Sequence, residues 1–501
     1  MMLRASLIAA LTAALSFVVA AQTGPAPRIW TDSALADWAT PIATLNVRPA
    51  HISEREYYAL PGDNFRTYPV YHPDAEPPGY WEELQKKKPE PLVDVSTIRT
   101  RADWIAAGER AFREMDGFWS RTTDAAVIAQ ARDARSFDGA LKLADGSAYG
   151  PRWVVTPQGV MLSYVACANC HRSFRRDGTV LPGGPRGPRP AGSPGVTPRV
   201  PGAQGSPPVM QRYFVGDSIA TIAWRLFTVP WAPDDRVERL RDAESQELRV
   251  LAANDDPGIF NRPHGSPFYA TKILDLQNLR YSHYMDATAT HRLRGPEDVA
   301  RYAAFISGAD PMEFGSYHIL SDPQRTLRFR YADEVLYSIG MYLMSLEPPR
   351  NPDSAPASTL ARGEQVFRRE GCVNCHTPPD YTNGRLTLAQ GWQPPTSHPN
   401  HDDILPVSVE TDPGLALRTR KGTGLYKIPS LRGVWYRPRL LHDGSLASLE
   451  EMFDPARLRA DYVSNGWHPP GTRARAVSGH VFGLGLSPED KAALLGFLRS
   501  L

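Results

Sequence analysis

Two copies of the pattern Cys-x-x-Cys-His constrain this 501-residue chain more than any other feature. The pattern is the attachment signature of c-type haem. Two thiols on one helical turn can reach the two vinyl groups of one porphyrin, while the next residue directs its imidazole at the iron. The sequence therefore predicts two covalently bound haem c groups, with His171 and His376 as the first iron ligands. All four cysteines of the chain are used: Cys167, Cys170, Cys372 and Cys375.

Other uses of paired cysteines fit less well. The two Cys-x-x-Cys knuckles of a zinc site usually stand about 15–20 residues apart, whereas about two hundred residues separate these pairs. A thioredoxin-like dithiol accounts for one pair but not for two pairs that are each followed by histidine. Disulfides within each pair are no better supported.

The start of the chain indicates export. Arg4 precedes an apolar run over residues 5–20, and Val19-Ala20-Ala21 provides small residues for cleavage. These features predict a secretory signal peptide over residues 1–21, with an uncleaved anchor as the alternative. No later stretch is long enough to span a membrane, so we expect no integral membrane segment after cleavage. Haem attachment to this motif occurs outside the cytoplasm, so the expected location is periplasmic or secreted.

Charge and composition narrow the class of protein. The formal net charge is +2 and no long basic or acidic run occurs, so nothing indicates nucleic-acid binding. The hydrophobic fraction of 42% is sufficient for packed cores, and 47 prolines with 39 glycines indicate long irregular loops.

An internal repeat divides the body of the chain. Residues 106–114 and 361–369 share Ala-x-Gly-Glu-x-x-Phe-Arg, and residues 333–346 and 489–501 both end in aromatic-Leu-x-Ser-Leu. Each half then has the order of a cytochrome c domain: helix, haem motif, loops and a closing helix that crosses the first. Gly108 and Gly363 would allow close approach at the two crossings. Chance similarity between amphipathic helices is the alternative.

The predicted fold is mainly α, with two cytochrome c-type domains and long irregular loops. An irregular arm rich in proline and aromatic residues precedes them, and its aromatics are expected to serve packing. The expected boundaries are a signal peptide at 1–21, the arm at 22–98, domain 1 at 99–346 with a mobile Pro/Gly-rich loop at 181–208, a linker at 347–358 and domain 2 at 359–501.

The second axial ligand of each iron decides the chemistry. For haem 2 the downstream candidates are His398, His401, His442, Met452, His468 and His480. His442 and His480 each stand just before a predicted helix and could reach the iron, although a core or surface histidine is the usual alternative for any one of them. For haem 1, no histidine occurs between His171 and His264, which favours an open or weakly held sixth position.

Two further sets of residues are candidates for the site. Asp286 and His291 lie in a segment rich in tyrosine, acid and imidazole that could line a distal pocket and move protons. A hydrogen-bonded turn before a helix at residues 296–307 is the alternative. Arg432, Arg437 and Lys427 could pair with haem propionates, with a solvated basic face as the alternative.

The C-terminal half carries a resemblance to a known family. The run Lys-Ile-Pro-Ser-Leu-Arg-Gly-Val at 427–434, followed by Leu-His-Asp-Gly-Ser at 441–445, resembles the bacterial di-haem cytochrome c peroxidase superfamily. The resemblance covers residues 100–501 loosely and 360–501 well. The chain departs from the peroxidases because Ala456 stands where they place a methionine, and because it lacks their loop histidine after the first haem motif.

A closer likeness is to the rubber-oxygenase branch of this superfamily. In that branch a Gly-His pair near the C-terminus supplies the distal ligand of the second haem, and the N-terminal haem binds oxygen. Gly479-His480 matches that pair, so the resemblance favours His480 over His442. The resemblance also implies calcium between the domains, on residues that the sequence does not identify.

These observations predict a di-haem c-type cytochrome in which electrons pass through haem 2 to haem 1. Haem 1 would reduce peroxide, or would activate oxygen and oxidise an organic substrate. The alternative is a non-catalytic electron-transfer cytochrome, and the missing nearby histidine favours the enzyme. The expected partners are a small-molecule substrate and either a small redox protein, such as a cytochrome or cupredoxin, or a quinol-linked donor.

Overall fold

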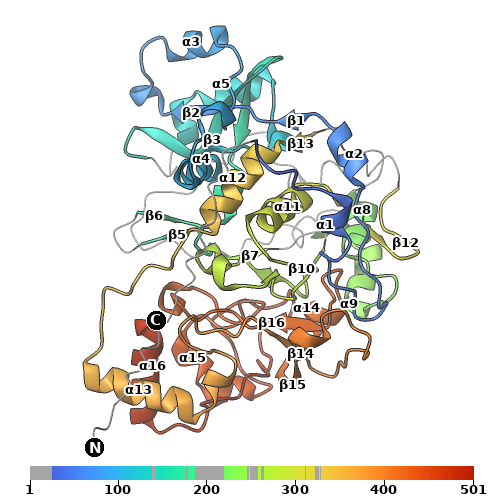
Figure 1. Cartoon of the computed structure of the whole chain (residues 1–501), viewed down its shortest axis with the longest axis vertical. Coiled ribbons are helices and arrows are strands. Elements are labelled where there is room, and N and C mark those ends of the chain that lie inside the picture. Colours follow the sequence, from blue (N-terminus) through green and yellow to red (C-terminus); the bar gives the residue numbers. More distant parts are fainter. Residues whose placement is uncertain are drawn as a thin grey trace, which may run out of the picture.

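The computed structural model (Figure 1) places most of the chain. The predicted signal peptide lies outside the described residues. The described ranges are 25–137, 143–175, 179–186, 219–244, 247–248, 258–260, 264–310, 312–321, 327 and 329–501.

Three helices frame the first half of the body. Helix α4 (Arg101–Glu114) packs against α12 (Asp333–Leu343), which also packs against α11 (Pro296–Ile306). Gly108 lies at the α4–α12 crossing, where an added Cβ atom would stand 1.8 Å from the Ser338 carbonyl oxygen. The close backbone approach predicted at Gly108 is therefore present.

The second half repeats this crossing. Helix α13 (Ala357–Arg369) packs against the C-terminal helix α16 (Pro488–Ser500), and the pair lies at the end of the molecule away from the arm helix α3 (Figure 1). A Cβ atom on Gly363 would stand 2.2 Å from the Ala493 carbonyl oxygen. Both predicted helix crossings are thus built on a glycine of the repeated sequence.

Two of these helices begin at strong capping signals. The Thr100 hydroxyl accepts a hydrogen bond from the Asp103 backbone, and the Asp103 carboxylate accepts one from the Thr100 backbone, which closes a capping box at the start of α4. At α16 the Ser487 hydroxyl accepts a hydrogen bond from the Asp490 backbone, and proline stands at the first helical position.

The other helices of the described residues are short. The α-helices are α1 (Asp32–Leu35), α2 (Glu54–Ala59), α3 (Tyr80–Lys86), α5 (Ala125–Ala131), α6 (Cys167–Cys170), α8 (Ile219–Phe227), α9 (Asp235–Glu238), α14 (Gly414–Leu417) and α15 (Leu449–Met452). The 3-10 helices are η1 (Pro73–Ala75), η2 (Val95–Thr97), η3 (Phe118–Ser120), η4 (Ala134–Phe137), η5 (Arg239–Arg241), η6 (Leu276–Tyr281), η8 (Cys372–Asn374), η9 (His401–Asp403), η10 (Val434–Tyr436) and η11 (Pro455–Leu458).

Strands are more numerous than the sequence predicted. One three-stranded sheet has the order β2 (Thr67–Tyr71), β3 (Ser147–Thr156), β4 (Gly159–Tyr164), and another has β15 (Ile404–Thr411), β14 (Leu386–Ala389), β16 (Leu425–Lys427). The two-stranded pairs are β1 (Gly62–Asp63) with β13 (Arg330–Tyr331), β5 (Arg172–Phe174) with β6 (Val180–Pro182), β7 (Ile259–Phe260) with β8 (Thr271–Lys272), β9 (Tyr284–Met285) with β10 (His291–Arg292), and β11 (Glu313–Phe314) with β12 (Tyr317–His318).

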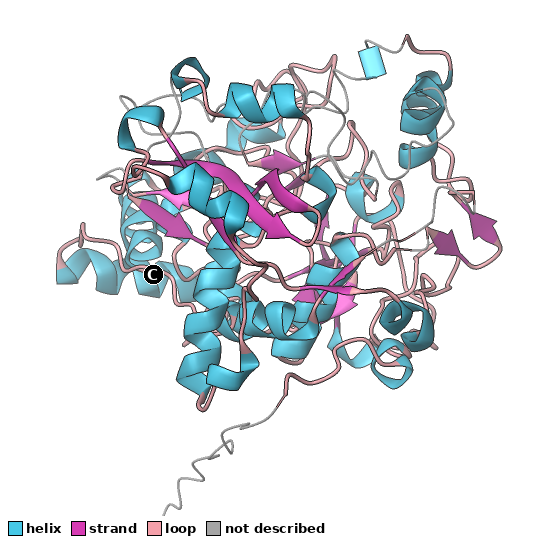
Figure 2. Ribbon diagram, turned by 90° about the horizontal axis from the view of Figure 1, so that it is seen from above, coloured by secondary structure: helices cyan, strands magenta, loops and turns pink. Residues whose placement is uncertain are grey.

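The fold class is therefore mixed, with 35% helix and 17% strand. The prediction of a mainly α fold is confirmed only in part, because helices frame both halves while strands fill the segments between them. Figure 2 shows the longer strands in the middle of the molecule, with helices around them. Within the described residues, no helix combines the length and apolar character needed to cross a bilayer.

The N-terminal arm is part of the body and not an irregular cover. Its strand β2 pairs with β3, and its strand β1 pairs in parallel with β13. Trp30 and Trp38 are fully buried in the core of the first half, which agrees with the packing role predicted for the aromatics of the arm. The sequence lacked a helical period here because the arm contributes strands and very short helices.

The predicted linker contacts the second half directly. Its residues run along the outside of the molecule between α12 and α13 (Figure 1). The Asn351 amide donates to the Arg499 carbonyl, and the Trp435 indole donates to the Pro349 carbonyl. Of the predicted Pro/Gly-rich loop, residues 181–186 are described and begin within β6, while 187–208 lie outside the described residues.

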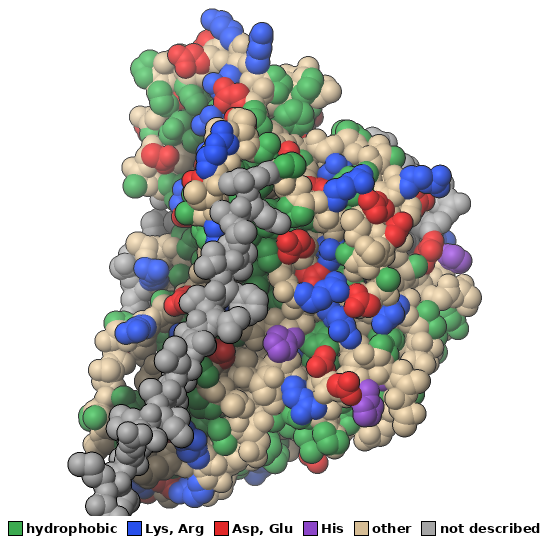
Figure 3. Space-filling model, viewed as in Figure 1, with side chains coloured by type: hydrophobic (Ala, Val, Ile, Leu, Met, Phe, Trp, Pro, Cys, Tyr) green, Lys and Arg blue, Asp and Glu red, His purple; other side chains and the backbone are tan. Residues whose placement is uncertain are grey.

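The visible surface agrees with the near-balanced net charge. On the face shown in Figure 3, acidic and basic side chains are interspersed.

Candidate haem centres

The second Cys-x-x-Cys-His motif forms a tight turn directly after α13. Gly371, with φ of 78°, ends that helix and turns the chain into η8, and the backbone amide of His376 donates to the Cys372 carbonyl at 2.9 Å. Cys372 and Cys375 are half-buried free thiols on this turn. Both sulfurs and the following imidazole are therefore presented by one short turn, as thioether attachment requires.

Backbone carbonyls orient the ring of His376. Its Nδ1 stands 3.1 Å from the Tyr381 carbonyl oxygen, so Nε2 is the nitrogen left to bind a metal. Burial lowers the pKa of His376 to about 4, the nearby His480 acts in the same direction, and hydrogen bonds to the backbone of Tyr381 and Pro429 oppose it. The ring is therefore neutral at ordinary pH, which is the form that binds iron.

His480 is the histidine that faces His376. The two ring centroids are 6.4 Å apart and the ring planes are inclined by 52°. Imidazole nitrogens bind first-row metals such as zinc at about 2 Å, and the centroid lies about 1 Å behind the nitrogen, so two histidines on opposite sides of one metal place their centroids about 6 Å apart. The observed spacing fits an iron between the two rings.

A buried arginine holds the loop that carries His480. Arg457 is fully buried and its guanidinium donates to the carbonyls of Val477, Gly479 and His480 at 2.5, 2.9 and 2.8 Å. His480 has a left-handed backbone with φ of 53°. No local sequence pattern marks Arg457, because the carbonyls that it holds in this loop lie about twenty residues away.

The other ligand candidates for haem 2 have different surroundings. The His442 ring lies against Tyr426 at 4.7 Å between centroids, and its carbonyl accepts from the Lys272 backbone. Met452 is buried in the core of the second half, where its carbonyl accepts from Arg457.

The first motif is built on a similar turn. Helix α6 carries both half-buried thiols, and the His171 backbone amide donates to the Cys167 carbonyl at 3.0 Å. The Nδ1 of His171 stands 3.2 Å from the Leu274 carbonyl oxygen. The Tyr149 hydroxyl donates to the Ala168 carbonyl within the turn. The two motifs lie in different halves, so the four cysteines do not form a single zinc site.

The histidines downstream of His171 all have other neighbours. His264 pairs with Asp310 at 2.6 Å, and the exposed His318 pairs with Glu313 at 3.5 Å. His283 packs against the backbone of Gly384, where a Cβ atom would stand 2.5 Å from the ring.

The predicted pair Asp286 and His291 lies in one buried network. Asp286 pairs with Lys421 at 2.7 Å. Its carboxylate also accepts hydrogen bonds from the Tyr302 hydroxyl and, at 3.2 Å, from the Thr290 hydroxyl. The Thr290 hydroxyl in turn contacts His291 Nδ1 at 3.0 Å. Burial raises the pKa of Asp286, but the Lys421 ammonium and the hydrogen bonds from Lys421 and Tyr302 outweigh it and hold the pKa below its usual range. Asp286 is therefore the counter-ion of a buried lysine.

His291 also belongs to a buried cluster of histidines and aromatic rings. Its ring lies 4.2 Å from Trp38 and 5.5 Å from His51 of the arm, and Phe305 contacts both histidines. Burial lowers the pKa of His51 to about 4 and lowers that of His291 as well. No sequence pattern marks His51 as part of this cluster, because His291 and Phe305 lie more than two hundred residues away from it.

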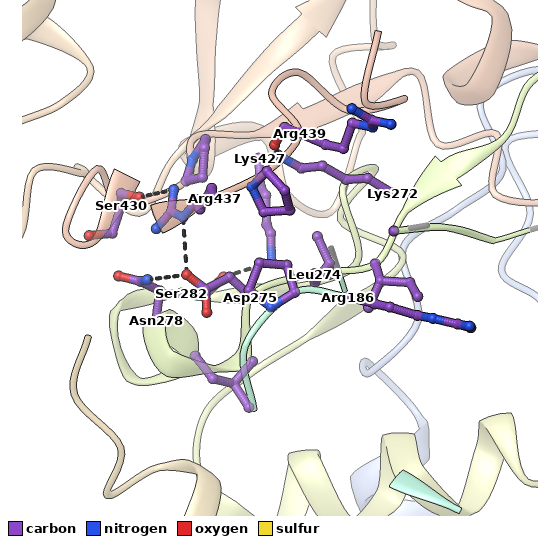
Figure 4. A pocket seen from close by; sticks show the side chains of 16 residues that line it. Arg186, Lys272, Leu274, Asp275, Asn278, Ser282, Lys427, Ser430, Arg437 and Arg439 are labelled. Atoms are coloured by element: carbon purple, nitrogen blue, oxygen red, sulfur yellow. Dashed lines mark hydrogen bonds and ion pairs between the residues drawn. The ribbon is translucent and has the colours of Figure 1, made fainter. Parts of the chain in front are cut away.

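A small, partly open cavity lies between the two halves (Figure 4). It is lined by Leu274, whose carbonyl contacts His171, and by Pro429, whose backbone contacts His376. Arg437 pairs with Asp275 across it at 3.0 Å. The predicted propionate partner Arg432 lies over the ring of Tyr281, with 5.3 Å from its guanidinium carbon to the ring centroid.

No group of three or more His, Cys, Asp or Glu side chains within the described ranges is arranged to hold a metal ion. A haem iron needs at most two protein ligands, so that arrangement is not required of a haem centre. The calcium implied by the resemblance stays a prediction.

Comparisons with known proteins give weak likenesses. The chain matches no family model, and no curated protein matches it. Among solved structures, a hydrazine synthase of Kuenenia stuttgartiensis aligns at 13% identity and a TM-score of 0.28, over 60% of this chain and 94% of that chain.

Two further solved structures align with the chain at similarly low values. A single-residue variant of the diheme peroxidase BthA of Burkholderia thailandensis aligns at 16% identity and a TM-score of 0.27, over 83% of this chain and 91% of that chain. A MauG-like protein associated with microbial copper homeostasis aligns at 20% identity and a TM-score of 0.21, over 34% and 56%. At these values the alignments establish no family for this chain.

Proposed function

We propose that this chain is a di-haem c-type redox protein. The observation that carries the proposal is the spacing of the His376 and His480 rings directly beside a Cys-x-x-Cys-His turn with free thiols. When bound, each haem supplies one-electron chemistry at its iron. His376 and His480 would hold haem 2 as a six-coordinate relay, in preference to His442 and Met452.

The chain's own residues suit this role for haem 2. The Tyr381 carbonyl fixes the ring of His376 and strengthens it as a ligand. Arg457 fixes the loop of His480 through its backbone. Because the protein holds both side chains, they would move little if the iron between them changed its oxidation state, which would favour electron transfer.

Haem 1, on His171, would be the reactive centre. The chain offers no histidine for more than ninety residues after His171. The histidines that follow within the first half pack against Asp310, Glu313, Gly384 and the Trp38 cluster. Haem 1 would then reduce peroxide or activate oxygen to oxidise an organic substrate.

The carbonyls that orient the two proximal histidines support a short route between the haems. Leu274 and Pro429 line the same cavity from opposite halves. Electrons would enter through haem 2 from a small redox protein or a quinol-linked donor and pass across this region to haem 1. The protein would act in the periplasm or outside the cell, where such haems are attached.

Haem binding is tested on the full chain, exported in a host that matures c-type cytochromes. Mass spectrometry should find two haems covalently bound, and the double variants Cys167→Ala with Cys170→Ala and Cys372→Ala with Cys375→Ala should each lose one. A protein that carries no covalent haem overturns the proposal.

Spectra of the oxidised protein then separate enzyme from carrier. We expect a high-spin component that shifts on addition of cyanide or peroxide, and it should persist in His442→Ala. His480→Ala should convert haem 2 from low-spin to high-spin, and added imidazole should reverse this. Two fully low-spin haems indifferent to both reagents would leave only the electron carrier.

A further inference from the structure

The cavity between the two halves is strongly basic. One wall comes from residues of the first half near β8 and η6, and the other comes from the segment Lys427–Arg439 (Figure 4). Among the described residues, the basic side chains that line it are Arg186, Lys272, Lys427, Arg437 and Arg439, and the one acidic side chain is Asp275.

Asp275 is already engaged. Its carboxylate accepts from the Arg437 guanidinium at 3.0 Å, from the Tyr436 hydroxyl at 2.7 Å and from the Asn278 amide at 2.9 Å. Asp275 therefore neutralises Arg437 and has little capacity left for the lysines.

Lys272 and Lys427 reach the cavity without a carboxylate in contact. Among the described residues, neither lysine forms an ion pair within 4.0 Å. Lys272 Nζ donates to the Arg439 carbonyl at 3.4 Å. Lys427 Nζ donates to the Ser282 hydroxyl at 3.2 Å and to the Tyr284 carbonyl at 3.0 Å. Burial lowers the pKa of Lys272 to about 7 and that of Lys427 to about 8. Two cations held away from water with neutral acceptors only are costly unless an anion joins them.

We propose that this cavity binds a carboxylate group between the Lys272 and Lys427 ammonium groups. One source of this carboxylate is a haem propionate, and that source rests on the proposed function. The cavity is suitably placed for it, because Leu274 and Pro429 line the cavity and contact the two proximal histidines through their backbone. A free small carboxylate is the other source of the same chemistry. In either case the two ammonium groups stabilise a negative charge between the two iron centres.

The test uses full-length protein and the variants Lys272→Met and Lys427→Met, with the exposed Lys88→Met as the matched control. Methionine keeps the length of the side chain and removes the charge. The midpoint potentials are measured by spectroelectrochemical titration, and acetate binding is measured by calorimetry against chloride at equal ionic strength. The two lysines are varied separately, so that one misfolded variant does not decide the result.

If a propionate fills the cavity, each lysine variant should lower the potential of a haem relative to Lys88→Met, and acetate should bind to none of the haem-loaded proteins. Loss of a positive charge lowers the potential because it favours the more positive oxidised iron. If a free carboxylate fills it, acetate should bind to the wild type and to Lys88→Met, but at least tenfold more weakly to the lysine variants. Unchanged potentials together with no acetate binding overturn the carboxylate site.

Failure of the proposed function has a different signature. If the proposed function fails, the polypeptide carries no covalent haem and no iron potential can be measured. The carboxylate site is still tested in that protein, because acetate should bind to the wild type and not to Lys272→Met.

Discussion

Gly363 lies so close to Ala493 that a Cβ atom added to the glycine would stand 2.2 Å from the Ala493 carbonyl oxygen. The contact joins α13 to α16, and Gly108 makes the corresponding contact with Ser338 in the first half. Neither helix can move away without opening the core that it shares with its partner. Each half therefore depends on the absence of one side chain.

Gly363→Ala should destabilise the second half by about 1–3 kcal/mol, because the added methyl group forces the two helices apart. Denaturant unfolding measures the change. Gly485→Ala is the matched control, since nothing lies within 4 Å of its added Cβ and its backbone is not left-handed. Equal stability of the two variants would contradict the close crossing.

Arg457→Met should release the loop that presents His480. Removal of the guanidinium leaves the carbonyls of Val477, Gly479 and His480 without their donor, at a cost of about 3 kcal/mol. In the haem-loaded protein we expect a high-spin fraction at haem 2 that added imidazole converts to low-spin. Arg459→Met is the control, because Arg459 is exposed and pairs only with the equally exposed Asp461. A low-spin spectrum identical to that of the control would remove Arg457 from this role.

The helix crossings could be predicted because each depends on local sequence. The shared Ala-x-Gly-Glu-x-x-Phe-Arg marks the helix and supplies the glycine at the contact. The position of His480 followed from the resemblance, and the structure places its ring at 6.4 Å from that of His376.

The remaining features depend on partners that are distant in the sequence. Asp286 was predicted to be catalytic from its polar neighbours, yet its ion-pair partner Lys421 lies 135 residues away and belongs to no motif. His51 and Trp38 of the arm contact His291, which lies more than two hundred residues away in the sequence. No local periodicity encodes such contacts.

Acid should loosen the arm through His51. Its pKa in the folded protein is about 4, compared with 6.5 when unfolded. Between these values the unfolded chain binds a proton that the folded protein excludes, so stability falls as the pH drops from 6.5 to 4 and is unaffected above that range. At about 1.4 kcal/mol per pKa unit, the loss approaches about 3 kcal/mol.

The measurement compares urea unfolding at pH 7.5 and pH 4.5. His51→Gln should lose less stability on acidification than the wild type does. The exposed His318→Gln should keep the wild-type dependence. If His51→Gln retains the full loss, His51 does not drive it.

The buried pair Asp286 and Lys421 should show strong energetic coupling. Lys421→Met leaves a buried carboxylate without its cation, which should cost about 3–5 kcal/mol, whereas Lys421→Met combined with Asp286→Asn should recover much of that loss. Removal of the ammonium should also raise the pKa of Asp286, because burial then acts unopposed by its nearest cation. Urea unfolding of the two single variants and the double variant gives the coupling energy. Peroxide turnover by folded Asp286→Asn separates the two roles, since a purely structural carboxylate predicts the wild-type rate and a proton-transfer role predicts a loss of about tenfold or more.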